Sequence, residues 1–341
     1  MAFENRSFDA VFYEAFEEEE KVLREFLPQD VNCLFTWKTI QESGHELPPS
    51  PIISTRTQSE FPDAWSPHLK AIMTRSTGYD HVSSYIIRNG MRDRISCAYL
   101  PDYAARAVAE QAMLLWTALS RKMKKQMKSF ESFNRDGLTG GEVFGKTILV
   151  AGVGRIGSKI VEIASGLGMK VLGFDIKPQK VLEEKFFLKY VSLEDALPTA
   201  DIVVCALPLT SGTEGLFNYA LLSKVKKGAF FINIARGEIS PSIDILKLLD
   251  ESRLGGAGLD VYDCERELAL YLRGGRSAGD FPDGPGKRAE AVLKMMERDD
   301  VVLFPHNAFN TVESVRRKCC QAVENLSCFL NEGRFLTPVE F

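Results

Sequence analysis

The stretch KTILVAGVGRIGSKIVEIASGLGMKVLGFD, residues 146–175, decides the fold of this 341-residue chain. It opens with a short apolar run, KTILVAG, which predicts a buried strand. The next segment, IGSKIVEIASGLG, has the spacing of an amphipathic helix with Gly168 just past its end, and KVLGFD predicts a second strand. A strand, a helix and another strand in succession indicate a βαβ unit, and therefore a parallel sheet.

Three glycines lie between the first of these strands and the helix. Gly152, Gly154 and Gly157 have the spacing GxGxxG, which is a weak signal alone because glycines also mark ordinary turns. Its position between a strand and a helix makes it strong. Gly152 permits the tight turn, Gly154 lets the backbone approach a pyrophosphate, and Gly157 allows the helix to pack closely. We therefore expect a dinucleotide-binding loop here.

An acidic residue, Asp175, ends the second strand. A carboxylate at this point accepts hydrogen bonds from the adenosine ribose hydroxyls and repels a 2′-phosphate, so NAD is favoured over NADP as the cofactor. Lys177 and Lys180 follow closely and leave NADP open.

Further short apolar runs follow the glycine loop, and weaker ones precede it. The later runs are DIVVCALP, GAFFINIARG, GAGLDVYD and DVVLFPH. Their nearly continuous apolar character is typical of strands buried on both faces of a parallel sheet, so this half of the chain is predicted to be doubly wound α/β. The first hundred residues contain VNCLFTW, PIISTRT, LKAIMTRSTGYD and RISCAYLP, which predict a smaller α/β unit.

Three other segments carry structural expectations. Residues 104–130 predict one long helix with basic residues at its C-terminal end, where they complement the helix dipole. The four glutamates at 17–20 predict a solvated helix face. The long polar, glycine-rich segment between Glu265 and His306 predicts a surface excursion.

Composition excludes several classes of function. The net charge is −4 and the pI is near 5.8, which disfavours binding to nucleic acid or to an anionic membrane. No apolar run is long enough to span a membrane, and the N-terminal residues lack the pattern of a signal peptide. The seven cysteines form no CxxC pair, so we expect no metal site and a cytoplasmic protein with reduced thiols.

Polar residues stand directly after three of the predicted strands. Arg236 follows FINIA, Asp260 follows GAGL with Glu265 shortly beyond, and His306 follows VVLFP. Each alone has an ordinary structural interpretation: a surface arginine, a helix cap, a solvated acid or a histidine near the core. Because ligands bind at the carboxyl ends of parallel strands in open α/β sheets, the four together favour a functional site.

The residue types in this set suit the reduction of a 2-oxo acid by a nicotinamide cofactor. A forked guanidinium can bind the substrate carboxylate and carbonyl oxygen, and a histidine can donate a proton near neutral pH. A carboxylate beside the histidine would favour the imidazolium form and hold the ring in one tautomer. The cofactor itself transfers the hydride.

Over essentially its whole length the chain resembles the D-isomer-specific 2-hydroxyacid dehydrogenases, and most of all their D-lactate-dehydrogenase-like branch. The resemblance rests on TRSTGYDHV, YLPDYAARAVAE, GKTILVAGVGRIG with Asp175, LPLTSGT, GAFFINIARGE, GAGLDVYDCE and PHNAFNT. It implies an NAD-dependent oxidoreductase that interconverts a small 2-oxo acid and the D-2-hydroxy acid, with His306 as the acid and base.

The resemblance also implies roles for individual residues. Arg236 corresponds to the arginine that binds the substrate carboxylate, Glu265 to the acid paired with the catalytic histidine, and His306 to that histidine. The substrate-binding residues are Ser76, Thr77, Gly78 and an aromatic, either Tyr99 or Tyr103. The cofactor-binding residues are Gly152, Gly154, Arg155, Ile156, Gly157, Asp175, Pro208, Thr210, Thr213, Ala235 and Asp260.

The architecture implied by the resemblance has two domains. A Rossmann-type NAD domain, residues 104–308, is inserted in a smaller flavodoxin-like substrate domain made of residues 1–103 and 309–341. Hinge motion at the two crossings would exclude water from the hydride, and the helix starting near Ala104 resembles an arm for homodimer formation. Arg266 stands where the family often has proline, which puts the local path after Glu265 in doubt.

Two alternatives stay open on the sequence. One is an NADH-sensing, co-repressor-like binding protein, which the acidic charge and the lack of a basic segment disfavour. The other is a glyoxylate or hydroxypyruvate reductase of the same family. Phe12, Tyr13 and Phe16 fit either a pocket for larger substrate side chains or the protein core.

Overall fold

Two parallel-sheet α/β units make up the chain, whose computed structural model describes residues 8–274 and 284–340. Unit 1 contains residues 1–104 and 310–341, and unit 2 contains residues 105–309. Each unit is built around its own sheet, one of five strands and one of seven. Among the described residues, no helix has the length and apolar character needed to cross a membrane.

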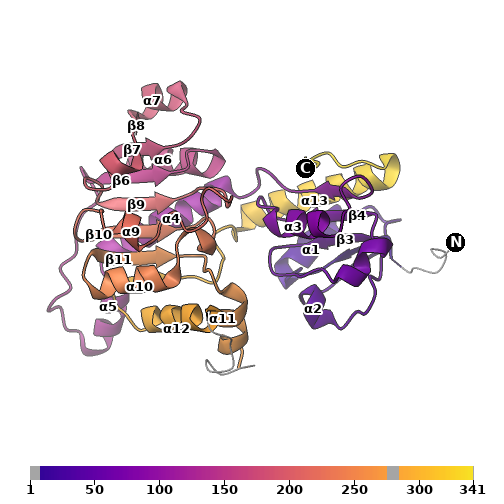
Figure 1. Ribbon diagram of the computed structural model, residues 1–341, viewed down its shortest axis with the longest axis horizontal. Helices are drawn as coiled ribbons and strands as arrows, with labels where there is room; N and C mark the ends of the chain where they lie inside the picture. Colours follow the sequence, from indigo (N-terminus) through magenta and orange to yellow (C-terminus); the bar gives the residue numbers. More distant parts are fainter. Residues whose placement is uncertain (1–7, 275–283, 341) are drawn as a thin grey trace. The chain divides into compact units, whose positions relative to one another are not determined.

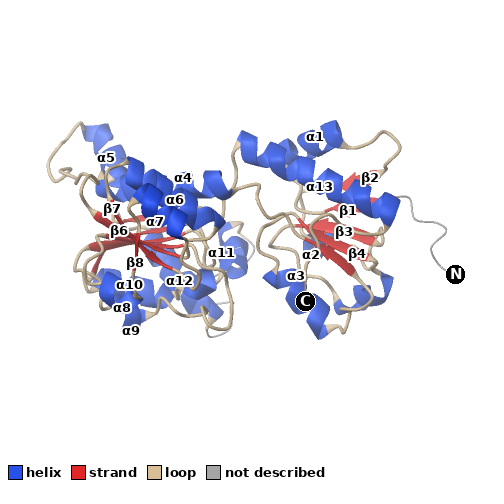
Figure 2. Ribbon diagram, turned by 90° about the horizontal axis from the view of Figure 1, so that it is seen from above, coloured by secondary structure: helices blue, strands red, loops and turns tan. Residues whose placement is uncertain are grey.

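Unit 1 has a parallel sheet with the strand order β2-β1-β3-β4-β5. Its strands are β1 (Ala10–Phe12), β2 (Cys33–Phe35), β3 (Ile52–Thr55), β4 (Ala71–Thr74) and β5 (Ser96–Ala98). Its helices are α1 (Glu17–Phe26), α2 (Ile40–Ser43), η1 (Asp63–His68), α3 (Asp80–Arg88) and α13 (Val312–Glu332). Helices α1 and α13 cover one face of the sheet, and α2 and α3 lie on the other (Figure 2).

Unit 2 has a parallel sheet with the order β12-β11-β10-β9-β6-β7-β8 (Figure 1). Its strands are β6 (Thr147–Ala151), β7 (Lys170–Phe174), β8 (Lys189–Tyr190), β9 (Ile202–Cys205), β10 (Ala229–Asn233), β11 (Leu254–Leu259) and β12 (Val301–Leu303). Its helices are α4 (Ala105–Ser120), α5 (Met123–Ser129), η2 (Phe130–Ser132), α6 (Arg155–Gly166), α7 (Lys180–Phe186), α8 (Leu193–Ala196), α9 (Tyr219–Leu222), η3 (Gly237–Ile239), α10 (Ser242–Asp250), α11 (Glu265–Leu272) and α12 (Pro285–Met296). The chain order reverses direction at β6, which places the end of β6 at a topological switch point.

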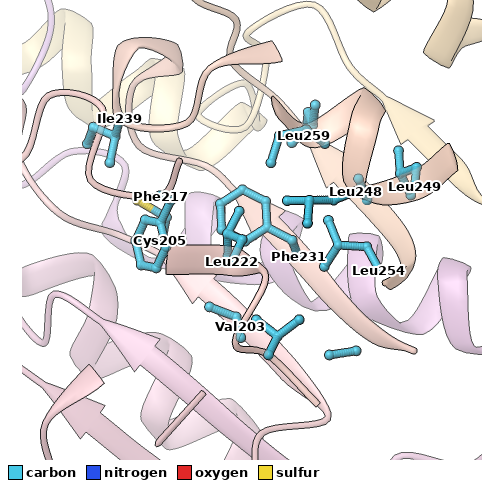
Figure 3. Packing of buried hydrophobic residues seen from close by; sticks show 14 of the residues in the cluster. Val203, Cys205, Phe217, Leu222, Phe231, Ile239, Leu248, Leu249, Leu254 and Leu259 are labelled. Atoms are coloured by element: carbon cyan, nitrogen blue, oxygen red, sulfur yellow. The ribbon is translucent and has the colours of Figure 1, made fainter. Parts of the chain in front are cut away.

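The core of unit 2 explains why its strands are apolar throughout. Helices α4 and α6 cover one face of the sheet, and α8, α9, α10 and α12 cover the other (Figure 2). On this second face Val203, Phe231 and Leu259 from three strands pack with Phe217 and Leu248 (Figure 3). Both faces are buried, so the doubly wound α/β prediction and the positions of the predicted strands are confirmed.

The single long helix expected at residues 104–130 is wrong. The helix ends at Ser120, and α5 begins at Met123 after Lys122 adopts a left-handed conformation with φ of 50°. Among the basic residues, Lys124 is not a solvated helix end, because its ammonium donates to the carbonyl groups of Met296, Arg298 and Val301. These bonds join α5 to the segment that leads into β12 and to the first residue of that strand.

The solvated face expected for residues 17–20 is also only partly correct. The side chain of Glu19 is fully buried and pairs with Arg75 and Lys318. Glu17, Glu18 and Glu20 remain at least partly exposed. An unbroken run of one residue type hides which member faces the core, because a helix turns its successive side chains to different sides.

The segment between Glu265 and His306 is not simply a surface excursion. It contains α11 and α12, and α12 buries Ala289, Val292 and Met295 against the core of unit 2. Residues 275–283 of this segment lie outside the described residues.

Candidate active site

In the glycine loop between β6 and α6, the backbone passes close to other backbone atoms at Gly152 and at Gly157. A Cβ atom on Gly152 would lie 2.6 Å from the carbonyl oxygen of Ala206, and Gly152 has φ of 92°. A Cβ atom on Gly157 would lie only 1.9 Å from the carbonyl oxygen of Gly152. Gly154, by contrast, has open space around its Cβ position and caps the start of α6. The loop therefore leaves its backbone accessible at Gly154, where a phosphate can approach the helix N-terminus, next to Arg155 and Ile156.

Asp175 links the end of β7 to the glycine loop. Its Oδ2 atom accepts the backbone N–H of Val153 at 2.7 Å, and its Oδ1 atom accepts the N–H of Lys177 at 2.8 Å. Gln179 adds a bond from its amide nitrogen to the carbonyl of Val153, at 2.8 Å. The carboxylate thus lies at the carboxyl edge of the sheet beside the loop.

The side chain of Thr213 forms hydrogen bonds that hold the turn after β9. The Thr213 hydroxyl donates to the Pro208 carbonyl at 2.6 Å and accepts the N–H of Thr210 at 2.8 Å. Its bonds hold a turn at the same edge of the sheet, one strand away from β6.

Arg236 is positioned by a residue that the sequence analysis missed. Asn233, fully buried at the end of β10, donates to the Arg236 carbonyl at 2.9 Å and to the Ser240 hydroxyl at 2.8 Å. Its amide oxygen accepts the N–H of Ala235 at 2.9 Å. The signal was present in GAFFINIARG, where one amide interrupts the apolar run directly before the arginine.

Gly237 brings the loop of Arg236 against the next loop of the sheet. A Cβ atom on Gly237 would lie 1.9 Å from the carbonyl carbon of Tyr262 and 2.3 Å from the nitrogen of Asp263. Only a glycine fits this approach, which joins the segment after β10 to the segment after β11.

His306, which follows the outermost strand β12, lies in contact with Glu265 at this edge of the sheet. Nδ1 of His306 lies 2.9 Å from Oε2 of Glu265, and the two side chains are 19% and 26% exposed. Glu265 begins α11, and its other oxygen accepts the N–H of Tyr262 at 3.3 Å. The pair is therefore supported from the protein side and reachable from solvent.

Asp260 fixes the backbone around the imidazole. Its carbonyl accepts the N–H of His306 at 2.8 Å, and its carboxylate accepts the N–H groups of Asn307 and Ala308, each at 3.0 Å. Burial raises the pKa of Asp260, and these two N–H groups oppose the rise. His306 has φ of 51°, a conformation that a residue other than glycine keeps only when its surroundings hold it.

The residues expected to bind substrate lie in unit 1, after β4 and β5. Ser76 donates to the Gly78 carbonyl at 2.6 Å, and Thr77 donates to the Leu100 carbonyl at 3.1 Å. Tyr99 packs edge-on against Tyr79, with ring centroids 5.0 Å apart. Tyr103 is buried instead, which favours Tyr99 as the available aromatic.

The family model described as "D-isomer specific 2-hydroxyacid dehydrogenase, NAD binding domain" matches residues 112–308. The chain belongs to this family. The match lies within unit 2, so unit 2 is an NAD-binding domain, and NAD is the cofactor of the protein.

Relatives with established names cover most of the chain. A D-lactate dehydrogenase, kk1H, of Curvularia clavata is 32% identical over 72% of this chain and 68% of its own length. A glyoxylate reductase of Pyrococcus furiosus is 31% identical over 93% of this chain and 85% of its own length. The protein is thus an NAD-dependent oxidoreductase of the 2-hydroxyacid dehydrogenase family.

Solved structures agree with this family in fold. A D-lactate dehydrogenase from Aquifex aeolicus, complexed with NAD and lactic acid, has a TM-score of 0.82 and 25% identity, over 97% of this chain and all of its own. The enzyme of Escherichia coli has a TM-score of 0.79 at 22% identity, over 97% of this chain and 99% of its own. The predicted combination of a Rossmann NAD domain and a smaller α/β domain is confirmed.

Proposed function

We propose that Arg236, Glu265 and His306 are the catalytic residues of this dehydrogenase, and that it reduces a small 2-oxo acid to the D-2-hydroxy acid. The observation that carries the proposal is the 2.9 Å contact between His306 and Glu265 at the carboxyl edge of the NAD-binding sheet. A histidine paired with a carboxylate at a ligand edge is the arrangement that proton transfer requires.

The pairing determines which nitrogen of the ring handles the proton. Because Nδ1 of His306 faces Glu265, Nε2 is the atom left for the substrate. In the direction of reduction, the Nε2–H of the imidazolium donates its proton to the carbonyl oxygen of the oxo acid. In the direction of oxidation, neutral Nε2 accepts the proton of the hydroxyl group. Bound NAD(H) supplies or accepts the hydride.

Arg236 would bind the substrate through its carboxylate. A guanidinium offers parallel N–H donors in a fixed plane, which matches the two oxygens of a carboxylate. In this structure its Nη1 donates to the Ala235 carbonyl at 2.9 Å, within its own turn. Asn233 and Gly237 keep that turn in place, so they position Arg236 without contacting substrate.

The other proposed roles divide between the two units. Residues 104–308 form the NAD domain, and residues 1–103 with 309–341 form the substrate domain. In the substrate domain, Ser76, Thr77 and Gly78 would bind the carboxylate, and Tyr99 would contact the substrate. In the NAD domain, the cofactor contacts would be Gly152, Gly154, Arg155, Ile156, Gly157, Asp175, Pro208, Thr213, Ala235 and Asp260.

The substrate can be identified by measuring NADH consumption with a panel of oxo acids. We expect NADH consumption with pyruvate, and the same assay with glyoxylate, hydroxypyruvate, phenylpyruvate and branched oxo acids ranks the side chains accepted. A preference for glyoxylate or hydroxypyruvate would assign the protein to the reductases of the family. No NADH consumption with any of these acids would contradict the proposed reaction.

We further propose a homodimer formed through α4 and α5. Met127, Phe130 and Phe133 are each at least two-thirds exposed, next to a shallow apolar hollow lined by Leu114 and Ala118. A second copy of the chain is the simplest cover for an apolar surface of this kind. Sedimentation should give the mass of a dimer, and Phe130→Asp should shift it to that of a monomer.

A cytoplasmic location is also proposed. All seven cysteines are free, which suits a reducing compartment.

A further inference from the structure

The segment after β11, residues 260–265, contacts the loops on both sides of it at the carboxyl edge of the unit 2 sheet. Two adjacent residues, Tyr262 and Asp263, make contacts in different directions, one toward the His306 turn and one toward the start of α10. Tyr262 is buried, and the side chain of Asp263 is only 4% exposed. Neither belongs to the catalytic or cofactor-binding residues proposed above.

Tyr262 contacts both members of the His306–Glu265 pair through the backbone. Its hydroxyl donates to the Phe304 carbonyl at 2.8 Å, and the same carbonyl accepts the N–H of His306 at 3.1 Å. Its own N–H donates to Oε1 of Glu265 at 3.3 Å. Burial is the main cause that raises the pKa of Tyr262, so the hydroxyl stays protonated and remains a donor. The turn that holds His306 at φ of 51° is thereby joined to the 260–265 segment.

Asp263 joins the same segment to helix α10. Its Oδ1 atom accepts the hydroxyl of Ser242 at 2.5 Å, and its Oδ2 atom accepts the N–H of Ser242 at 3.3 Å. Ser242 is the first residue of α10, and the residue before it, Pro241, has no polar side chain to accept a helix N–H. Asp263 takes the place of that capping side chain, and the helix N-terminus favours its carboxylate. Nε of Arg288 lies 3.9 Å from Oδ2.

The start of α10 is in turn connected to Arg236. Asn233 donates to the Ser240 hydroxyl at 2.8 Å and to the Arg236 carbonyl at 2.9 Å. Ser240 lies two residues before Ser242, so one short stretch of chain is bonded to Asn233 at one point and to Asp263 at another. Hydrogen bonds therefore connect the turn of Arg236 to the 260–265 segment.

We propose that Tyr262 and Asp263 are positioning residues that keep the His306–Glu265 pair at a fixed distance from Arg236. Tyr262 holds the turn of His306, and Asp263 holds the segment that follows Arg236. The inference rests on the proposed function, in which the imidazole and the guanidinium act on one substrate. Groups that act on the same substrate lose much of their effect when one of them is displaced by about 1 Å.

Tyr262→Phe tests the contact with the His306 turn. The variant keeps the ring and loses only the hydroxyl, so it should fold. We expect kcat for the oxo acid to fall roughly tenfold, because the imidazole is no longer held against the reacting oxygen. KM and the Kd of NADH should stay within about twofold of the wild type, because Arg236 and the glycine loop keep their contacts.

The matched control is Tyr85→Phe. Tyr85 is also buried, and its hydroxyl also donates to a backbone carbonyl, that of Pro62, at 3.2 Å. This variant loses the same kind of hydrogen bond in unit 1 and should lower the melting temperature by a similar amount, but its kcat should not change.

Asp263→Ala tests the contact with α10. The variant separates the 260–265 segment from the chain that follows Arg236, so we expect kcat to fall roughly tenfold and KM to rise roughly fivefold. It should fold, because the side chain of Arg288 is 37% exposed and water can solvate it. Asp263→Asn keeps an oxygen that can accept the Ser242 hydroxyl, and should bring kcat and KM back to within about threefold of the wild type.

The control for this variant is Asp201→Ala. Asp201 accepts the N–H of Thr147 at 2.9 Å and pairs with Lys226 at 2.7 Å. It therefore joins two segments through a backbone N–H and a second side chain, as Asp263 does, but at the amino edge of the sheet. Its loss should lower the melting temperature and leave kcat and KM unchanged.

Each outcome decides one of the two proposals. A wild type that reduces no oxo acid contradicts the proposed function, and this inference with it. An active wild type overturns this inference alone if Tyr262→Phe and Asp263→Ala keep kcat and KM within about twofold, or if the two controls lose as much turnover as they do. If Asp263→Ala fails to fold, Ser242→Ala takes its place: it removes only the hydroxyl of the same bond and should raise KM roughly threefold, and an unchanged KM would overturn the role of Asp263.

Discussion

Two clusters of charged residues, one in each unit, differ in their contact with water. In unit 2, His306 and Glu265 are paired but remain 19% and 26% exposed. In unit 1, Glu19, Arg75 and Lys318 have no exposed surface. The pair in unit 2 can therefore exchange a proton with a ligand, whereas the cluster in unit 1 joins α1, α13 and the end of β4 through buried contacts.

The difference predicts different consequences of substitution. A partly exposed pair contributes little to folding, because water replaces the lost partner. Removal of one member of a buried cluster destabilises the fold strongly, because the charge left behind cannot be solvated. Substitutions in unit 2 should therefore change kinetics more than stability, and removal of the shared anion in unit 1 should change stability more than kinetics.

The largest effect on stability is expected for Glu19→Gln. This change leaves Arg75 and Lys318 buried without their carboxylate, so the free energy of unfolding should fall by about 3–5 kcal/mol in denaturant titrations. The matched substitution Glu25→Gln removes an exposed carboxylate of the same helix and should change it by less than about 0.5 kcal/mol. Equal effects of the two variants would contradict the claim that the burial of Glu19 makes its loss costly.

The difference in stability between the wild type and Glu19→Gln should depend on pH. The pKa of Glu19 is lowered from 4.5 to about 2 in the folded state. A lowered pKa of an acid stabilises the fold above the unfolded value and loses that contribution as the pH falls. The stability difference between the wild type and Glu19→Gln should thus be constant above about pH 5 and shrink between about pH 4.5 and about pH 2. A difference that grows on acidification would show that Glu19 is not the shared anion.

Glu265→Gln should lower turnover, though less than the loss of His306 itself. The amide can still accept a hydrogen bond from Nδ1 of His306 but cannot stabilise the imidazolium, so kcat should fall roughly a hundredfold, or about 2.7 kcal/mol. The melting temperature should change little because the pair is partly exposed. A kcat within twofold of the wild type, measured at saturating substrate, would contradict the pairing role.

Arg236→Lys should have the smallest effect of the three. The ammonium keeps the positive charge but loses the planar fork, so we expect roughly a tenfold loss in kcat/KM, about 1.4 kcal/mol, with KM raised and turnover slowed. Steady-state kinetics with pyruvate measure this. Unchanged constants would mean that the guanidinium does not bind the carboxylate.

The polar residues at the carboxyl edge of the unit 2 sheet could be predicted from the sequence, because they occupy fixed points of a simple pattern. Arg236, Asp260 and His306 each follow an apolar strand, and parallel strands bring their carboxyl ends to one edge. The glycine loop and Asp175 follow the same pattern. Asn233 was missed because its role depends on the turn that follows it, which strand periodicity does not describe.

The cluster in unit 1 could not be predicted in the same way. Lys318 lies far from Glu19 along the sequence and meets it only because α1 and α13 pack side by side. Within the run of glutamates, no local signal distinguishes Glu19 from its neighbours. The break at Lys122 was likewise invisible, because a helix-forming sequence continues across it and tertiary bonds of Lys124 settle the path.

The proposed reaction depends most directly on the proton transferred by His306. The decisive measurement is kcat of His306→Gln with the preferred oxo acid at saturating NADH, together with the Kd of NADH. Glutamine keeps a polar side chain of similar length but cannot donate an ionised proton, so kcat should fall roughly a thousandfold while NADH still binds as in the wild type. A kcat within tenfold of the wild type would contradict the assignment of His306 as the acid and base.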